Sequence, residues 1–198
     1  MKAERDGTKA RLLAEARDLY LEEGFARFSL REVARRAGVS PAAVYRHYDG
    51  KEALFGEVCA AGLQVFYGYL VRSLAEATPQ ARLAASARHY LSFALEHPAD
   101  YRVLFMGGAA DAPTAPPSGE ARVPEPTFQF LVDRVRECMQ AGALREGDPE
   151  ETAAIIWAHV HGLVSLRLTG HFVRAGTDAQ FARFYERAAD QLVAGLRP

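Results

Sequence analysis

Two glycines divide the first 51 residues into three short helical segments, and these breaks constrain the fold more than any other feature of the sequence. Helices are predicted over about residues 8–23, 29–37 and 40–48, and Gly24 and Gly38 follow the first two where a helix C-cap favours glycine. The third segment has room for only about two turns at 3.6 residues per turn. Two tyrosines, an arginine and a histidine crowd its end, which is more than one buried face of a short helix can absorb.

Polar residues mark the starts of these helices. Thr8 and Ser29 stand at N-cap positions, and Glu32, three residues after Ser29, completes the pattern of a capping box. Ser40 precedes Pro41, whose missing N–H is tolerated at the first helical position. The sequence therefore predicts two adjoining short helices with a tight turn between them.

The rest of the chain also has the pattern of helices. No Asn-Gly or Asp-Gly turn joins two alternating runs, and β-branched residues are sparse beside Ala, Leu, Arg and Glu. Further helices are predicted over about residues 51–75, 79–96, 98–106, 127–140, 149–170 and 178–196. Residues 107–126 contain five prolines and are predicted to be a mobile connector. The predicted fold class is all-α, with a three-helix helix-turn-helix domain over residues 1–51 and a helical domain over residues 52–198.

Composition narrows the class of protein. The chain has 198 residues, 49% of them apolar, enough for one or two small domains with a sizeable core. Cys59 and Cys138 lie too far apart in sequence for a CxxC metal site, and two cysteines make no disulfide framework. The first thirty residues have no apolar h-region, and the least charged stretch, residues 152–166, is shorter than the roughly 20 residues of a bilayer span. We expect a cytoplasmic protein without a membrane partner.

Charge is divided unevenly along the chain. Residues 1–51 hold 11 Lys and Arg against 8 Asp and Glu, whereas residues 52–198 hold 13 against 17. The beginning of the chain is thus net basic and the remainder net acidic. A basic end beside an acidic body suggests a polyanion as partner for the basic end, although a small excess of this kind also occurs on ordinary solvated surfaces.

The second and third helices, joined by the sequence AGVS, form a helix-turn-helix pair in which glycine allows a tight reversal. The second helix of such a pair enters the major groove of DNA. Here that helix begins with small residues, which allow close approach to the groove floor, and ends with residues long enough to reach the phosphates. The small residues are Pro41, Ala42 and Ala43, and the long ones are Tyr45, Arg46 and His47. Val44 is left to anchor the helix inward.

The stretch SLREVARRAGVSPAAVYRHYDGKEALF, residues 29–55, resembles the DNA-binding segment of the Tet-repressor family of bacterial regulators. The residues that carry the resemblance are Ala34, Ala37, Gly38, Val39, Ser40, Tyr45, Tyr48, Lys51 and Leu54. The resemblance implies that Tyr45, His47 and Lys51 contact phosphates. It also implies that Arg31, Pro41, Ala42 and Ala43 face the bases.

Physical chemistry agrees with these roles in part. Lys51 stands at a helix N-terminus, whose backbone N–H groups favour a phosphate. Because Pro41, Ala42 and Ala43 offer no hydrogen-bonding side chain, base readout depends on methyl contacts to thymine and on Arg31, whose guanidinium can bond guanine. The predicted DNA interface consists of Arg31, Ser40, Pro41, Ala42, Ala43, Tyr45, Arg46, His47 and Lys51.

An alternative to DNA binding stays open at this point. Helix pairs with a glycine turn occur in many all-α proteins, and in such a protein Tyr45 and Tyr48 are core aromatics. We expect Tyr48 in the core and Tyr45 outside it.

The segment IIWAHVHGLVSLRL, residues 155–168, carries no charge until its last turn and is predicted to be buried nearly all round. It contains a stripe of small residues that would let another helix approach closely: Ala154, Ala158, Gly162 and Ser165. We infer a homodimer in which helices 149–170 and 178–196 pair with the same helices of a second subunit. The alternative is that both helices are core of a single chain.

The same segment resembles the WHG-type regulatory domain of Tet-repressor-like proteins, through Trp157, His161 and Gly162. Residues 97–105, HPADYRVLF, are similar to another stretch of that domain. Members of the family commonly hold a small molecule among the body helices, and the resemblance implies the same here. The predicted ligand-binding residues are apolar or amphipathic groups at inward positions: Phe66, Tyr69, Phe93, Met106, Trp157 and His161.

Signals for catalysis, a metal or a cofactor are absent from the sequence. There is no GxSxG, HExxH, GxGxxG or P-loop pattern, and His159 and His161 lie about 200° apart around a helix, so they cannot chelate one ion. The predicted function is a non-enzymatic repressor, released from a palindromic operator by a small hydrophobic effector. The alternatives are a DNA-binding dimer whose body serves assembly or a protein partner, and an enzyme that uses the body cavity.

Overall fold

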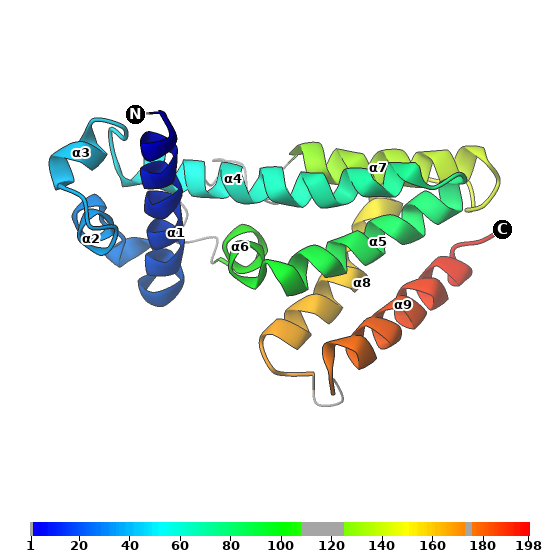
Figure 1. Cartoon of the computed structure of the whole chain (residues 1–198). Helices are drawn as coiled ribbons and strands as arrows, with labels where there is room; N and C mark the ends of the chain where they lie inside the picture. The colour runs from blue at the N-terminus through cyan, green and yellow to red at the C-terminus, as the bar shows by residue number, and fades with distance from the viewer. Residues whose placement is uncertain (1, 108–124, 173–175) are drawn as a thin grey trace. The chain divides into compact units, whose positions relative to one another are not determined.

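The computed structural model describes residues 2–107, 125–172 and 176–198, and all regular secondary structure within them is helical (Figure 1). The elements are α1 (Lys2–Arg27), α2 (Leu30–Arg36), α3 (Pro41–Tyr45), α4 (Lys51–Val71), the 3-10 turn η1 (Arg72–Ala75), α5 (Pro79–Glu96), α6 (Pro98–Tyr101), the π-helical turn η2 (Arg102–Met106), α7 (Glu125–Gln140), α8 (Pro149–Leu168) and α9 (Asp178–Gly195). The predicted all-α class is confirmed. The predicted connector, residues 107–126, falls almost entirely outside the described residues.

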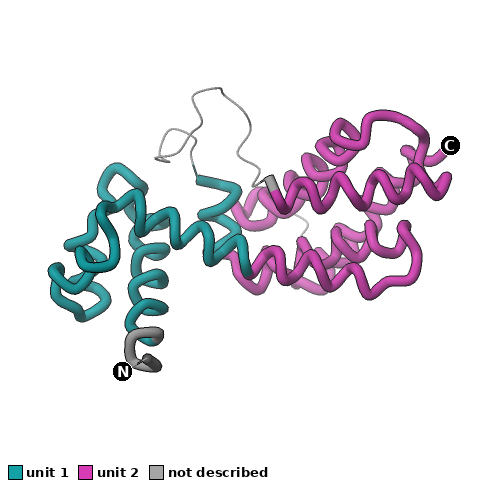
Figure 2. Tube along the Cα trace, turned by 90° about the horizontal axis from the view of Figure 1, so that it is seen from above, with its two compact units in different colours: residues 1–64, 99–122 teal, residues 65–98, 123–198 magenta. Residues whose placement is uncertain are grey.

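The chain divides into two compact units (Figure 2). Unit 1 comprises residues 1–64 and 99–122, and unit 2 comprises residues 65–98 and 123–198. The helix α4 contributes its first two-thirds to unit 1 and its end to unit 2. Unit 1 thus contains more than the predicted DNA-binding domain of residues 1–51, because α4 and η2 add buried residues to its core. The functional boundary at residue 51 stays a prediction.

Glycines interrupt α1 and follow the end of α2 at the two predicted positions. Gly24 has a φ of 72° and breaks the helical path of α1, which begins earlier than the predicted cap Thr8. Gly38 has a φ of 67° in the turn between α2 and α3. A side chain other than glycine is strained at such angles, so Gly24 sets the break within α1 and Gly38 sets the turn after α2.

The predicted caps of α2 and α3 form through their serines. The Ser29 hydroxyl accepts the Glu32 N–H at 3.3 Å, and the Ser40 hydroxyl accepts the Ala43 N–H at 3.2 Å. The capping box predicted at Ser29 is wrong in its second half, because the Glu32 carboxylate binds Arg35 and Arg36 instead. A complete capping box begins α9, where the side chain of Gln180 returns to the Thr177 N–H at 2.8 Å.

The core of unit 1 joins α1, α2, α3 and α4 around a group of aromatic rings. These rings are Tyr20, Phe25, Phe28 and Phe55, with centroids 4.5 to 6.0 Å apart. Val103 of η2 adds a buried side chain to this core, and Arg17 of α1 pairs with Asp100 of α6 at 3.0 Å. The segment after α5 therefore belongs structurally with the N-terminal helices.

In unit 2, the helices α5, α7, α8 and α9 pack on one another. One core cluster lies between α5, α7 and α8, with Val132, Val135 and Ile156 at its centre. The Tyr185 hydroxyl donates to the Ala87 carbonyl at 3.0 Å and ties α9 to α5. This bundle contains both predicted dimer helices and, on α5 and α8, three of the six predicted effector residues: Phe93, Trp157 and His161.

By length and composition, Lys51–Ala75 is apolar enough to cross a membrane. Its inward residues have another explanation, because they fill the two cores. Leu54, Phe55 and Val58 are buried in unit 1, and Phe66 and Leu70 are buried in unit 2.

Gly38→Ala is expected to lower the free energy of unfolding by about 1–2 kcal/mol, because a positive φ that glycine adopts freely strains alanine. No atom lies within 4 Å of the added methyl group, so the effect isolates backbone strain. Gly56→Ala is the matched control in α4, where the methyl group also meets open space. Helix propensity predicts stabilisation of up to about 1 kcal/mol there. Urea denaturation measures both, and a loss of similar size in the two variants would contradict the assignment.

Candidate functional site

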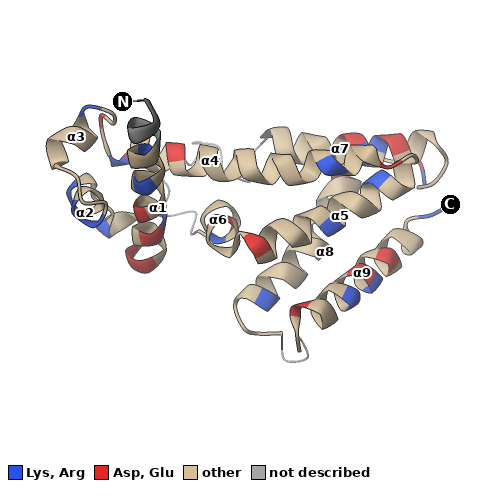
Figure 3. Ribbon diagram, viewed as in Figure 1, with Lys and Arg blue, Asp and Glu red and all other residues tan. Residues whose placement is uncertain are grey.

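The residues predicted to contact DNA lie on one exposed part of unit 1. Arg31 is exposed on α2, and Ser40, Pro41, Ala42, Tyr45, Arg46 and His47 are exposed on and beside α3, while Ala43 and Lys51 are half-buried. Tyr45 is 51% exposed, whereas Tyr48 is buried. Lys and Arg residues lie on α2 and beside α3 (Figure 3). The two tyrosines thus separate as expected, one to the surface and one to the core.

The short helix α3 is anchored to the core of unit 1 by one buried residue. Val44 is fully buried in the core of unit 1, and the N–H groups of His47 and Tyr48 donate to its carbonyl at 2.9 and 3.0 Å. The small residues before Val44 point elsewhere and leave the N-terminal end of α3 without bulky side chains. The Ser40 hydroxyl caps α3 as an acceptor, and its own hydrogen is still available to donate to a phosphate.

Lys51 has a structural contact that sequence reasoning missed. Its Nζ donates to the Phe25 carbonyl at 2.9 Å and lies 4.3 Å from the centroid of the Phe25 ring. The contact ties the start of α4 to the end of α1. An ammonium group has three donors, so this bond leaves the predicted phosphate contact chemically possible. The sequence carried no signal for it, because the two residues are far apart along the chain.

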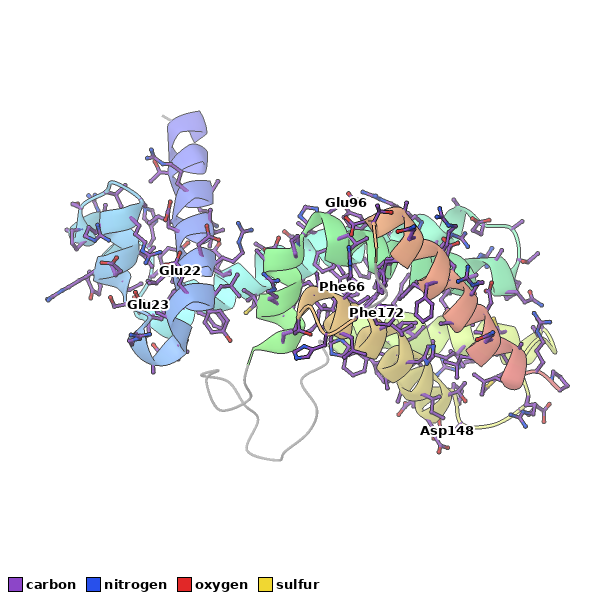
Figure 4. The ribbon with its side chains drawn as sticks, turned by 90° about the horizontal axis from the view of Figure 1, so that it is seen from below. Glu22, Glu23, Phe66, Glu96, Asp148 and Phe172 are labelled. Carbon is purple, nitrogen blue, oxygen red and sulfur yellow. The ribbon has the colours of Figure 1, made fainter. Side chains whose placement is uncertain are left out.

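Arg35 and Arg36, both on α2, bind acidic residues of the same unit. Arg36 reaches Glu22 of α1 at 2.7 Å and Glu32 at 3.1 Å. Glu22 and Glu23 are labelled in Figure 4. Hydrogen bonds from Arg35 and then Arg36 hold the pKa of Glu32 at about 2. Arg36 therefore links α2 to α1, beside the core that the two helices share.

Five of the six predicted effector residues lie in unit 2 and connect through a side chain that sequence reasoning missed. The Phe66 ring contacts Phe93 at 4.9 Å and Tyr90 at 5.6 Å between centroids. The Tyr90 hydroxyl hydrogen-bonds with His161 Nδ1 at 3.0 Å, and the His161 ring lies 5.1 Å from Trp157. Figure 4 shows Phe66 among the side chains between the helices of this unit. We call these residues, together with Tyr69, the aromatic cluster.

Tyr69, at one edge of the aromatic cluster, contacts three polar residues: Glu96, His97 and Arg72. The Tyr69 hydroxyl donates to Glu96 Oε2 at 2.5 Å and lies 3.2 Å from His97 Nε2, and the hydrogen bond to Glu96 raises the pKa of Tyr69. The Arg72 guanidinium covers the Tyr69 ring at 4.1 Å. Tyr90 and Phe93 lie on α5 and His97 is its C-cap residue, and their spacing of three and four residues is a pattern from which Tyr90 and His97 could have been predicted.

The sixth predicted effector residue, Met106, is at the end of η2 in unit 1. The structure therefore does not bring it together with the other five within one compact unit. Among the described residues, no group of three or more His, Cys, Asp and Glu side chains is arranged to hold a metal ion. Burial lowers the pKa of His161, which favours the neutral imidazole at physiological pH.

Within the single chain the helix α8 is not buried all round, and the side that stays open includes the predicted stripe of small residues. Ile155 and Leu166 are each 45% exposed, and Ala154 and Ala158 are also exposed. A methyl group added to Gly162 would meet no atom within 4 Å. The small residues and two large apolar ones thus form an exposed strip along α8, which we call the α8 strip.

A hollow of about 400 Å³ lies beside the start of α9. It is lined by Phe172, Gln180, Phe181, Arg183, Phe184 and Arg187, of which Phe172 is labelled in Figure 4. The Phe172 ring contacts Phe181 at 5.5 Å and Phe184 at 4.9 Å. This hollow shares no residue with the aromatic cluster.

Comparison with known proteins places these features in a family. Residues 12–58 match the family described as "Bacterial regulatory proteins, tetR family", and residues 83–192 match "Tetracyclin repressor-like, C-terminal domain". The chain is 24% identical over 99 residues to the uncharacterized HTH-type transcriptional regulator YobS of Bacillus subtilis. The aligned part is 50% of this chain and 52% of YobS, so the chain spans about half the length of that relative.

Solved structures of other proteins share the fold of this chain over nearly its whole length. A protein of unknown function from Rhodococcus sp. RHA1 is 30% identical with a TM-score of 0.75, and the match covers 96% of both chains. The TetR family transcriptional regulator PfmR from Thermus thermophilus shares the fold, with a TM-score of 0.69, 20% identity and coverage of 95% of this chain and 100% of PfmR. Because the C-terminal family match alone covers more than half of the chain, this protein belongs to the TetR family of transcriptional regulators.

Proposed function

We propose that this regulator is a cytoplasmic repressor that binds a palindromic operator as a homodimer and is released by a small hydrophobic effector. The observation that carries the DNA-binding part is the surface of α3. Its small N-terminal residues are open to solvent over the buried Val44, and exposed Tyr45, Arg46 and His47 follow them. That surface fits the floor and walls of a major groove.

Sequence-specific readout would depend on few groups. Methyl groups of Ala42 and Ala43 can contact thymine, and the exposed guanidinium of Arg31 can bond guanine. Ser40, Tyr45, Arg46, His47 and Lys51 would hold phosphates, which fix register and carry no base preference.

Dimerisation would use the α8 strip together with α9. An apolar strip of this kind, bordered by small residues, suits close packing against another helix. A two-fold dimer presents two recognition helices to half-sites about 34 Å apart or a multiple of that distance, which gives the homodimer its role in operator binding.

The aromatic cluster is the proposed effector site in unit 2. It combines large apolar rings with a few hydrogen-bonding groups at Tyr69, Tyr90 and His161, as small-molecule sites commonly do. Effector binding would shift the population toward dimers whose recognition helices are wrongly spaced for successive major grooves. The helix α4, which contributes to both units, is the proposed lever.

A DNA-binding dimer without an effector is the second candidate. Its support is that the rings of the aromatic cluster contact one another, with Phe93 fully buried. In that case the body serves assembly or a protein partner.

Arg46→Ala is expected to weaken binding to every duplex about equally and to reduce the salt dependence by about one unit of slope, because one phosphate contact is lost. Arg46 suits the test better than Lys51, whose ammonium also ties α4 to Phe25. Fluorescence anisotropy over a series of salt concentrations measures both effects. The matched control is Arg136→Ala on α7, which removes the same charge from unit 2. An unchanged slope in Arg46→Ala would contradict its phosphate role.

Gly162→Arg is expected to convert the dimer into a folded monomer, because the new side chain meets open space in one chain and blocks the α8 strip. Analytical ultracentrifugation measures the mass, and circular dichroism measures the helical content. Gly56→Arg, which also enters open space in unit 1, should remain dimeric. A dimeric Gly162→Arg protein would rule out the α8 strip as the interface.

A thermal-shift screen with small aromatic and acyl compounds is expected to find a binder that raises the melting temperature. A gain of 1 kcal/mol corresponds to about 2–4 °C for a chain of this size. Trp157→Leu should abolish the shift, whereas Phe172→Leu in the hollow beside α9 should retain it. A binder that still stabilises Trp157→Leu would place the site elsewhere, and a screen without binders would favour the second candidate.

A further inference from the structure

The hollow beside the start of α9 has an apolar part made of three phenylalanines. Phe181 is buried, whereas Phe172 and Phe184 are half-buried. The Phe172 and Phe184 rings meet at a centroid distance of 4.9 Å and an interplanar angle of 52°, so they are tilted against each other. Two of the three rings therefore still offer part of their surface to a further apolar group.

The polar part of the hollow consists of side chains that donate hydrogen bonds. Gln180, Arg183 and Arg187 are exposed, and their spacing of three and four residues places them along one side of α9. The Gln180 Oε1 atom accepts the Thr177 N–H at 2.8 Å, which leaves the NH2 group of that amide to donate. A guanidinium group donates and cannot accept. The hollow thus combines aromatic rings with N–H donors.

Within the described part of the chain, the two arginines of the hollow form no ion pair, although Glu186 and Asp190 are on the same helix. Asp178, at the start of α9, is paired with Arg167 of α8 at 2.7 Å. Two like charges four residues apart destabilise a helix. An anion bound between them would offset this repulsion.

We propose that this hollow is a binding site for an aromatic carboxylate. The phenylalanine rings would pack against the aromatic part of the ligand, and the two guanidinium groups would donate charge-assisted hydrogen bonds to its carboxylate. The volume of about 400 Å³ lies within the range of small-molecule sites. The site goes beyond the proposed function, because it shares no residue with the aromatic cluster and does not require DNA binding.

The test is isothermal titration calorimetry of the full-length protein with 2-naphthoate, and with 2-naphthamide as an uncharged analogue of the same shape. The wild-type protein is expected to bind 2-naphthoate with a dissociation constant below about 1 mM, as the ligand efficiency of a molecule of this size allows. It should bind 2-naphthamide at least about tenfold more weakly, because the amide offers no charge to the guanidinium groups.

Variants assign the binding to the hollow. Arg183→Gln and Arg187→Gln should each weaken 2-naphthoate binding by about three- to tenfold, the size of a charge-assisted hydrogen bond at an exposed site. Phe184→Leu, which removes a ring and keeps an apolar side chain, should weaken it by about two- to tenfold. Arg136→Gln on α7 removes the same charge from an exposed arginine of unit 2 and should bind as wild type does. Thermal melting by circular dichroism shows that each variant is folded.

Three results would overturn the proposal: no binding of 2-naphthoate by the wild-type protein, equal binding of 2-naphthamide, or full affinity in the double variant Arg183→Gln/Arg187→Gln. Affinity lost in Trp157→Leu and kept in both arginine variants would place the carboxylate in the aromatic cluster instead. Binding by Gly162→Arg but not by the wild-type protein would show that a second subunit covers the hollow.

The proposed DNA binding is tested separately. A wild-type protein that selects no duplex from a random-sequence pool would contradict the repressor function, while its affinity for 2-naphthoate would still decide the role of the hollow.

Discussion

A helix of five residues cannot hold its own position, because it forms too few hydrogen bonds to be stable in water. In α3 the position is fixed by the burial of Val44 and, one turn later, of Tyr48. Full burial of a side chain such as valine contributes about 1.5–3 kcal/mol, which is large for so short an element. Since these two residues supply the anchoring, the residues around them are left to meet a partner.

The supports of α3 come from both neighbouring helices. On one side Arg36 fastens α2 to Glu22 of α1, and on the other Lys51 fastens the start of α4 to Phe25. In both contacts a cationic side chain reaches across to α1, in one case to a carboxylate and in the other to a backbone carbonyl. They explain why unit 1 needs α4 as well as the three helices before it, and why its surface can carry several cations without losing its shape.

Unit 2 combines a closed interior with an open flank. The aromatic cluster is filled by its own rings, and its polar atoms are hydrogen-bonded at Tyr69, Tyr90 and His161. By contrast, the α8 strip leaves Ile155 and Leu166 partly in water. A ligand can enter such an interior only if it replaces the contacts between the rings. An exposed apolar flank, by contrast, is stabilised by any partner that covers it.

The sequence by itself determined the all-α class, the breaks at Gly24 and Gly38, and the serine caps of α2 and α3, because helix starts and stops depend on residues within one turn of each other. It also separated Tyr45 from Tyr48 correctly. Only the tertiary structure decided that Tyr90 links Phe66 to His161, that Lys51 binds the Phe25 carbonyl, and which side of α8 is uncovered. Those features depend on which helices pack together, and residues far apart in sequence carry no local signal of their contact.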